Sequence, residues 1–412
     1  MENLITIELD PKSKPNEVHF DIKGEPDNGL DKSIINALRR TLMSSIPSVA
    51  FRTKIDNSDL IIKTNNSSLH NEFIADRIGL IPLYINPLDY NKQYLFYLHV
   101  KNDNKTPNYT VTSNNFDIYP LKESVDPNSI QGIKIDDYDK GNPLSQKEKS
   151  IIFRPFKYKN REEFCPITEL KSTNSSVGQE LEIYGVPSVS YSHEDAKWQA
   201  VSRCTYAFKS DENLFQKVLK ENIDINKIAK SNQTKYEKEL RISESERYFY
   251  RDKNLEPYIY TFHIDGVHFM NSKQLFILSN QIIIETLEKM IGEFPKISTG
   301  EKSFISLEES ENGIFTLIIN GSDDTFGNII QSFISREMID DKSILSICGY
   351  KKKHPLEDII IFTISLNRGN KVFTLNKPQQ IVAIVEVFNE TCNSLIQIFS
   401  LIKDEADKKL WV

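Results

Sequence analysis

The C-terminal end of the sequence contains the pattern that most restricts how the chain can fold. Eight residues follow one another there at spacings of 4-3-4-3-4-3-4: Ile381, Val385, Phe388, Cys392, Leu395, Phe399, Ile402 and Ala406. A repeat of 3.5 residues forms a narrow apolar stripe along one side of a helix, which is buried against a second helix. Flanking Ile384, Ile396 and Ile398 widen the stripe, so the pattern favours a helix bundle over an isolated coiled coil.

The order of predicted elements is repeated along the chain. The first copy has strands, a helix, a strand and a second helix, which we place at 4–9, 17–23, 31–46, 259–267 and 275–290. The second copy has a strand, a helix capped by Asp324, a strand and the long helix, which we place at 315–319, 324–334, 359–366 and 377–406. Two modules with apolar helices bury them most simply against each other.

This repeat predicts an α+β chain with one interrupted module and one continuous module. The first module comprises 1–50 and 207–296, an antiparallel β-rich insert occupies 51–206, a linker occupies 297–312, and the second module comprises 313–412. The linker is expected because Gly292, Pro295 and the run 298–300 follow the first module's last helix. Residues 209–250 are charged and helix-prone, which is typical of a surface insertion.

Composition restricts the function. The 412 residues carry a formal net charge of −7, which disfavours a protein that coats nucleic acid non-specifically. The four cysteines, Cys165, Cys204, Cys348 and Cys392, are far apart in sequence, so we expect a reducing compartment and no metal site in this chain. The N-terminal residues do not resemble a signal peptide, and no apolar run reaches the ~18 residues of a membrane span. We expect a soluble intracellular protein without catalytic residues, because no nucleophile or metal-ligand motif is present.

The helix at 31–46 combines an apolar face with two adjacent arginines. Leu38 and Leu42 belong to the apolar face, as do Phe326, Ile330 and Phe333 of the second module's first helix. We expect these residues to pair the modules together with Ile381, Val385, Phe388, Leu395, Phe399 and Ile402. Arg39 and Arg40 lie outside this face, and from the pattern alone they can equally be solvated charges.

Several short motifs resemble the α-like assembly subunits of multisubunit RNA polymerases. The segments LDKSIINALRRTLMSSIPSVAF (30–51), NEFIADRIGLIPL (71–83), GQEL (178–181) and HEDAKW (193–198) are similar to motifs of bacterial α, archaeal D and the third subunit of eukaryotic polymerase II. Asp76 stands where that family usually has histidine. From Thr316 onward, DTFGN (324–328) and GY…HPLE (349–357) resemble the smaller partner, archaeal L or the eleventh subunit of polymerase II.

The resemblance implies a natural fusion of both partners into two dimerisation modules on one chain. It implies a non-catalytic assembly platform for a DNA-directed RNA polymerase, which holds the second-largest and largest subunits and small zinc-ribbon-like subunits. Magnesium and zinc are expected in those partners, no cofactor is expected here, and DNA is contacted only through the complex. Fusion of this kind resembles polymerases of large cytoplasmic DNA viruses, which implies host cytoplasm and virion, or the nucleus if the chain is cellular.

The resemblance also implies which residues face partner subunits. These are Arg39, Arg40, Glu72, Arg77, Leu80, Ile81, Pro82, His193, Lys197 and Trp198. Ordinary packing is the competing interpretation for 71–83, and a core or loop anchor is the competing interpretation for Trp198. Some relatives carry a cysteine cluster for zinc or an iron–sulfur centre in the insert, whereas here the insert has only Cys165 and Cys204. A DNA-binding transcription regulator built on the same fold is the alternative function, although no basic groove-facing helix supports it.

Overall fold

The computed structural model describes residues 5–25, 30–103, 107–126, 134–173, 178–253, 255–267, 269–299, 301–311, 313–339 and 343–410. The chain separates into two compact units. Unit 1 comprises Met1–Met43, Ser202–Gly266 and Asn271–Val412, and unit 2 comprises Ser44–Val201 and Val267–Met270. Residues of both predicted modules lie in unit 1, and most of the predicted insert lies in unit 2. Leu4, where the first strand was expected to begin, lies outside the described residues.

The first sheet of unit 1 brings together strands from both sides of the insert. Its order is β1 (Thr6–Leu9), β2 (Glu17–Lys23), β14 (Ile259–Gly266) and β13 (Val201–Phe208). Every second residue of β2 and β14 is buried, so the sheet has one apolar face and one polar face. The apolar face packs on helices, as the Phe20 and Phe276 rings show with centroids 5.0 Å apart.

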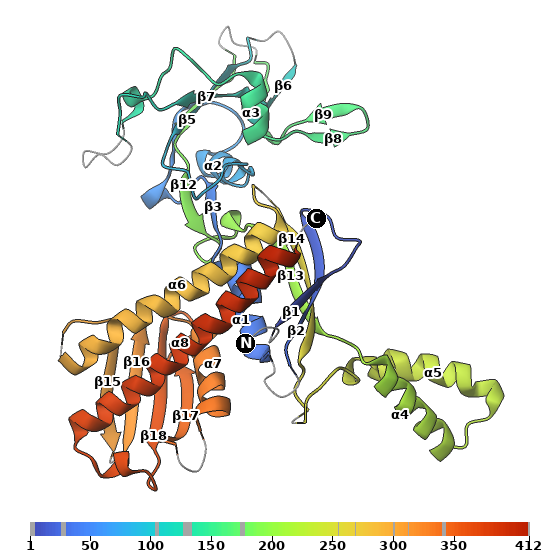
Figure 1. Ribbon diagram of the computed structural model, residues 1–412. Coiled ribbons are helices and arrows are strands. Elements are labelled where there is room, and N and C mark those ends of the chain that lie inside the picture. The colour runs from blue at the N-terminus through green and yellow to red at the C-terminus, as the bar shows by residue number, and fades with distance from the viewer. Residues whose placement is uncertain are drawn as a thin grey trace. The chain divides into compact units, whose positions relative to one another are not determined.

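The second sheet of unit 1 belongs to the C-terminal region. Its order is β15 (Ile305–Glu311), β16 (Ile314–Asn320), β18 (Ile359–Leu366) and β17 (Leu345–Lys352), with every pair antiparallel (Figure 1). Helix α7 (Asp324–Phe333) continues into a π-helical turn, Ile334–Met338, and helix α8 is Lys377–Lys409. Asp323 is the N-cap of α7, one residue before the expected cap, because its side chain accepts a hydrogen bond from the Thr325 backbone N–H.

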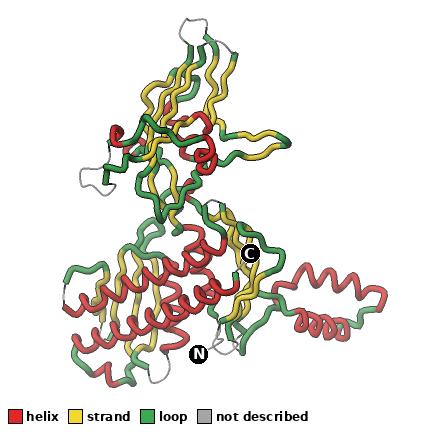
Figure 2. Tube along the Cα trace, turned by 45° about the horizontal axis from the view of Figure 1, so that its top comes forward, coloured by secondary structure: helices red, strands yellow, loops and turns green. Residues whose placement is uncertain are grey.

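Two long antiparallel helices, α6 (Ser272–Thr299) and α8, lie side by side in unit 1 (Figures 1 and 2). The Lys273 Nζ at the start of α6 donates to the Asp407 carbonyl near the end of α8, at 2.8 Å. Near the opposite ends of the two helices, the Phe294 and Phe388 ring centroids are 6.4 Å apart. Helix α8 therefore packs along another helix, as the stripe predicts.

The first turns of α8 depart from the predicted stripe. The stripe residues at 388, 392, 395, 399, 402 and 406 are buried. The first two stripe residues, Ile381 and Val385, are only half-buried. Gln380, Ala383, Ile384 and Val387 are buried in their place. A straight helix has 3.6 residues per turn and drifts from a 3.5-residue repeat, and here the first half of α8 also faces a sheet, with Phe388 5.4 Å from Phe362.

The predicted linker at 297–312 is largely ordered secondary structure. Helix α6 continues through Gly292 and Pro295 to Thr299, and β15 occupies Ile305–Glu311. Proline inside a helix removes a hydrogen bond and costs about 3 kcal/mol. Burial of Met290 and Phe294 against the bundle offsets that cost, since each large apolar side chain contributes about 2–3 kcal/mol when buried.

By length and composition alone, α8 would qualify as a membrane-spanning helix. The core helix of a soluble protein satisfies the same criterion, and the most apolar 18-residue window of α8 is 39% buried inside the structure. In this structure α8 packs against α6 and the second sheet, where Phe388 lies between Phe294 and Phe362.

Unit 2 is rich in antiparallel strands. Its main sheet has the order β4 (Leu60–Asn65), β11 (Glu180–Gly185), β5 (Tyr94–Lys101) and β7 (Phe116–Pro120). Three two-stranded pairs accompany it, β6 (Asn108–Thr112) with β10 (Pro166–Lys171), β3 (Pro47–Ala50) with β12 (Ser188–Tyr191), and β8 (Phe156–Tyr158) with β9 (Arg161–Glu163). Helices α2 (Asn71–Gly79) and α3 (Gln146–Ile152) belong to the same unit, which has an apolar core that includes residues from Val49 to Ile183. The α+β fold with an antiparallel insert is confirmed.

The predicted surface insertion at 209–250 is a helical hairpin of unit 1. Helices α4 (Glu212–Ile225) and α5 (Lys230–Glu244) carry a small apolar cluster of Phe215, Leu219 and Leu240. The Arg241 guanidinium binds Glu212 at 2.7 and 3.0 Å and lowers the pKa of that carboxyl to about 2.

Candidate module-pairing and partner-docking surfaces

Helix α1 (Lys32–Ser44) buries one face and presents its two arginines beside it. Ile34, Ile35, Leu38 and Leu42 are buried, as the apolar spacing predicts. The Arg39 side chain is half-buried, and its Nε donates to Asn36 Oδ1 one turn earlier, at 2.9 Å. This contact within the helix uses Nε, the nitrogen of the guanidinium that lies nearest the backbone.

Arg40 has a different environment from Arg39. Its Nε donates to Thr325 Oγ1 at 2.9 Å, and its Nη2 binds Asp323 Oδ2 at 3.0 Å. Asp323 is also the N-cap of α7, so one carboxylate stabilises the helix start and holds the arginine. The sequence reasoning assigned Arg40 to an outside partner, whereas the structure gives it an intramolecular partner in the C-terminal region.

A second contact of the same kind joins the N-terminus of α1 to the C-terminal end of α7 and the π-helical turn that follows it. Asp31 accepts a hydrogen bond from the Ser33 backbone N–H at 3.2 Å, as an N-cap residue of α1 does. Its carboxylate also accepts from the Ser332 hydroxyl and lies 3.6 Å from Arg336 Nη1. The two contacts are reciprocal, because α1 supplies Arg40 to the N-cap carboxylate of α7, and the π-helical turn after α7 supplies Arg336 to the N-cap carboxylate of α1.

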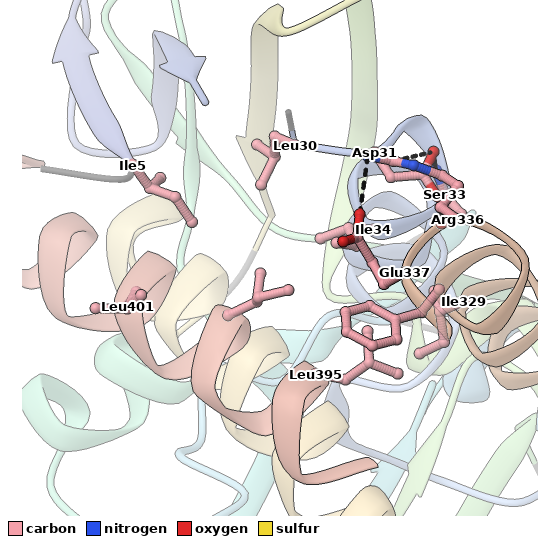
Figure 3. Close-up of a pocket in the computed structure, with 12 residues that line it drawn as sticks. Ile5, Leu30, Asp31, Ser33, Ile34, Ile329, Arg336, Glu337, Leu395 and Leu401 are labelled. Atoms are coloured by element: carbon pink, nitrogen blue, oxygen red, sulfur yellow. Dashed lines mark hydrogen bonds and ion pairs between the residues drawn. The ribbon is translucent and has the colours of Figure 1, made fainter. Parts of the chain in front are cut away.

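Apolar side chains surround a cavity of about 220 Å³ beside Asp31 (Figure 3). Its lining comes from the N-terminal strand, α1, α7 with its π-helical turn, and α8, and includes Ile5, Leu30, Ile34, Ile329, Phe333 and Leu395. Arg336 and Glu337 line it as well. The same residues that join the two helices therefore enclose an incompletely filled space.

The predicted module-pairing residues have unequal burial. Leu38, Leu42, Ile330, Phe388, Leu395, Phe399 and Ile402 are at most 1% exposed, while Phe326, Phe333, Ile381 and Val385 are half-buried. Gly327 lies within the DTFGN motif, and a Cβ there would be 2.5 Å from the Tyr350 ring of the GY motif. These two motifs are thus in direct contact, which explains why glycine is needed at that position.

The second predicted surface lies on unit 2, along α2 and the residues that follow. Glu72 and Arg77 are exposed, and Phe73 and Leu80 are 62% and 68% exposed although they are apolar. Arg77 Nη2 donates to the Pro166 carbonyl at 3.1 Å. Ile81 is buried and Pro82 is half-buried, so Ile81 supports this surface from below.

Helix α2 ends at Gly79, and Leu80 is its C-cap. A Cβ on Gly79 would lie 2.6 Å from Thr53 Cγ2 and 3.2 Å from the Phe51 carbonyl. Glycine is therefore required by the close approach of α2 to the segment after β3, and a left-handed cap has no part in it.

A salt bridge to an arginine holds the loop of the HEDAKW motif in place. The Arg52 guanidinium binds Glu194 through both carboxylate oxygens, at 2.9 and 3.1 Å, and the Ser190 hydroxyl also donates to Glu194. These hydrogen bonds lower the pKa of Glu194 to about 2, Arg52 having the largest effect. Arg52 also lies 5.4 Å from the centroid of the Trp198 ring.

Two predicted partner residues of this loop are buried in unit 2. Trp198 is 1% exposed and its Nε1 donates to the Ser188 carbonyl at 3.4 Å, so the structure favours the anchor interpretation. The Lys197 side chain is 7% exposed, and its Nζ donates to Thr53 Oγ1 at 2.7 Å. His193 remains exposed, and its backbone N–H donates to the Ser44 carbonyl.

Sequence reasoning missed the residues that connect this loop to α2. Thr53 receives the Lys197 hydrogen bond and donates its own to Asp76 Oδ1 at 2.8 Å. Asp76 is the position at which the sequence departs from the family pattern, and that departure was the one available signal. Arg52 had no signal, because a single arginine at the end of a strand is unremarkable in sequence.

Comparison with known proteins agrees with this architecture. The family model of the RNA polymerase Rpb3/Rpb11 dimerisation domain matches residues 27–287, more than half of the chain, and a second model with the same description matches residues 315–405. The four cysteines are free thiols in this structure.

Curated relatives belong to the same group. The chain is 26% identical over 183 residues to the DNA-directed RNA polymerases I and III subunit rpac1 of Dictyostelium discoideum, covering 43% of this chain and 46% of that protein. It is 27% identical over 179 residues to the DNA-directed RNA polymerase subunit Rpo3 of Methanobrevibacter smithii, covering 42% and 49%. The matches thus span about half the length of these relatives. With two matches to the dimerisation domain on one chain, the protein belongs to the RNA polymerase Rpb3/Rpb11 dimerisation-domain family, as a fusion of its D and L types.

Proposed function

We propose that this chain is the non-catalytic assembly-platform subunit of a multisubunit DNA-directed RNA polymerase. The observation that carries the proposal is the pair of dimerisation-domain matches on one chain. In a two-chain platform the partners must meet by diffusion, whereas here the second domain is held at high effective concentration near the first. The paired domains act as an intramolecular heterodimer through α6, α8 and the reciprocal α1–α7 contacts.

Partner docking uses side chains that the fold leaves accessible. On unit 2, exposed Phe73 and Leu80 lie beside exposed Glu72 and Arg77, and this mixture of apolar and charged groups is typical of an interface. On unit 1, Arg39 offers guanidinium Nη groups for carboxylates or carbonyls of a partner. The proposed partners are the two largest polymerase subunits and small zinc-ribbon-like subunits. Magnesium, zinc and catalysis belong to those chains, and DNA contact is indirect.

The proposal is tested first by recovering the tagged full-length chain from its native source and identifying co-purifying proteins by mass spectrometry. Stoichiometric recovery of two very large polymerase subunits is the expected result. Recovery of DNA or of one regulator without those subunits would instead favour the DNA-binding alternative. The same experiment tests the proposed compartment, either cytoplasm and virion for a viral source or the nucleus for a cellular one.

A second experiment separates docking from folding. Arg39→Ala should reduce capture of the second-largest subunit while leaving the far-UV circular dichroism and melting temperature unchanged. Lys32→Ala is the matched control, because Lys32 is an exposed cation on the same helix that is paired with Glu256 at 2.9 Å. Phe73→Ser and Leu80→Ser should weaken capture by unit 2. Undiminished capture by Arg39→Ala would remove the role proposed for that residue.

A further inference from the structure

The polar face of the first sheet in unit 1 carries four potential metal ligands in a two-by-two array. The register of β2 and β14 places His19 opposite His263 and Glu17 opposite Asp265. Residues 17, 19, 263 and 265 alternate with buried residues, so all four side chains stand on the same face of the sheet. The two histidines are 244 positions apart in sequence, and only the sheet brings them together.

The spacing of these groups suits one small cation. One nitrogen of each imidazole and one carboxylate oxygen of Glu17 all lie within 4.8 Å of one another. The two imidazoles are stacked in this ion-free structure, with centroids 3.7 Å apart and an angle of 29° between their planes. Ligands of a tetrahedral zinc ion are about 3.4 Å apart, since Zn–N and Zn–O bonds are about 2.0–2.1 Å. An imidazole binds a metal in its ring plane, so ion binding requires the two partly exposed rings to turn out of their stack about their side-chain torsions.

The fourth group, Asp265, carries an unsatisfied atom. Among the described residues its Oδ1 is a buried side-chain oxygen without a hydrogen-bond partner, and it lies 2.9 Å from His263 Nε2. Arg203 Nη2 is 2.8 Å from the same Nε2, and an arginine can only donate. In the neutral tautomer with its proton on Nδ1, His263 Nε2 accepts that bond, and in this form Nε2 and Asp265 Oδ1 are two acceptor atoms that face each other with no proton between them. A cation at this point would satisfy both.

Arg203 also shows that the array attracts positive charge. Its Nε donates to Asp265 Oδ2 at 2.8 Å, while Lys14 Nζ binds Glu17 Oε2 at 3.2 Å. Both contacts use the second oxygen of their carboxylate and leave Glu17 Oε1 and Asp265 Oδ1 for another ligand. A metal would replace the direct contacts of His263 Nε2 with Arg203 and Asp265 and would part the stacked rings, while the Arg203 Nε bond would continue to orient Asp265 from outside the coordination shell.

We propose that His19, His263, Glu17 and Asp265 form a binding site for a divalent transition-metal ion of the zinc class. Two imidazoles with carboxylates are the donor set that such ions prefer, and the hard ions magnesium and calcium prefer oxygen-only sites. The site contains no cysteine, unlike the cysteine clusters of some α-like subunits, and the proposal replaces the expectation that this chain binds no metal. An ion there would join β2 to β14, which lie on opposite sides of the insert in sequence, and so stabilise the interrupted module.

Zinc binding to the metal-free full-length chain, measured by calorimetric titration with Zn²⁺, tests the proposal. One equivalent should bind, and His19→Asn or His263→Asn should weaken the affinity by about a hundredfold or more, beyond the 10- to 100-fold loss typical of outer-shell changes. His99→Asn is the matched control, because His99 is a partly exposed histidine paired with Glu180 at 2.7 Å without a second imidazole. It should leave the affinity unchanged.

Cobalt spectroscopy distinguishes coordination by the histidines and carboxylates from coordination by a thiol. Co²⁺ should give the visible bands of nitrogen and oxygen coordination, without a thiolate charge-transfer band in the near ultraviolet. The half-buried Cys165 is the thiol most open to a metal, and such a band would assign the ion to it. That result, no stoichiometric binding, or equal affinities for His263→Asn and the wild type would each overturn the proposal. Circular dichroism of each variant verifies that the fold is retained.

Discussion

The α6–α8 pair of unit 1 and the α2 surface of unit 2 differ in whether their apolar side chains are buried. Along α8 the residues from Phe388 to Ala406 that face inward are apolar and buried, so the pairing is driven by removal of apolar area from water. On α2 and at its C-cap, the apolar residues Phe73 and Leu80 remain exposed. Hydrogen bonds from Lys197 to Thr53 and from Thr53 to Asp76 connect α2 to the neighbouring segments. The comparison shows that α8 buries its apolar residues within unit 1, whereas the α2 surface of unit 2 leaves Phe73 and Leu80 open to solvent.

Truncation of the α8 core should have the largest effect. Phe388 packs against both Phe294 and Phe362, so Phe388→Ala should lower the free energy of unfolding by about 3–5 kcal/mol. Val382→Ala on the same helix removes a 42% exposed side chain and should change it by less than about 0.5 kcal/mol. Urea unfolding followed by circular dichroism measures both. Equal effects would mean that α8 does not depend on its buried face.

Two glycine substitutions, one in each unit, compare how the units respond to an added side chain. Gly79→Ala forces a Cβ against Thr53 and the Phe51 carbonyl, so it should destabilise unit 2 by about 1–3 kcal/mol. Gly292→Ala in α6 has no neighbouring atom within 4 Å and should stabilise unit 1 by up to about 1 kcal/mol. Urea unfolding and hydrogen exchange of each unit show whether each substitution raises or lowers the free energy of unfolding. A stabilising Gly79→Ala would show that the close approach is not needed.

The Arg52–Glu194 pair predicts an acid response in unit 2. The folded-state pKa of Glu194 is depressed from 4.5 to about 2, so its contribution to stability is present above pH 4.5. That contribution is lost as pH falls from 4.5 towards 2, where the folded-state carboxylate is protonated. The stability difference between wild type and Glu194→Gln should therefore shrink over this window. Hydrogen exchange of the 194–199 loop against pH tests it, and a constant difference would contradict it.

The reciprocal α1–α7 contacts should have the smallest effect. Arg40 and Asp323 side chains are 37% and 32% exposed, so solvent screens their attraction. A double-mutant cycle with Arg40→Ala and Asp323→Ala should give a coupling free energy of about 0.2–1 kcal/mol, lower at high salt. No coupling at low salt would mean that the contact only accompanies the apolar packing.

The parts of the fold that sequence predicts are those set by local periodicity. The stripe from Phe388 onward and the buried face of α1 follow from spacing alone. The end of α6 was mispredicted because Gly292 and Pro295 signal a break that the tertiary burial of Phe294 overrides. The roles of Arg40, Gly79 and His263 depend on residues far away in the chain, and no local pattern contains that information.

The antiparallel packing of α6 on α8 has a consequence for synthesis on the ribosome. Helix α6 is complete at Thr299, but α8 ends at Lys409, so about 110 further residues must be made before its partner exists. At roughly 5–20 residues per second this interval is roughly 5–20 s. During that time the apolar side of α6 lacks its partner helix, so chain termination before α8 would leave apolar surface exposed, which favours aggregation.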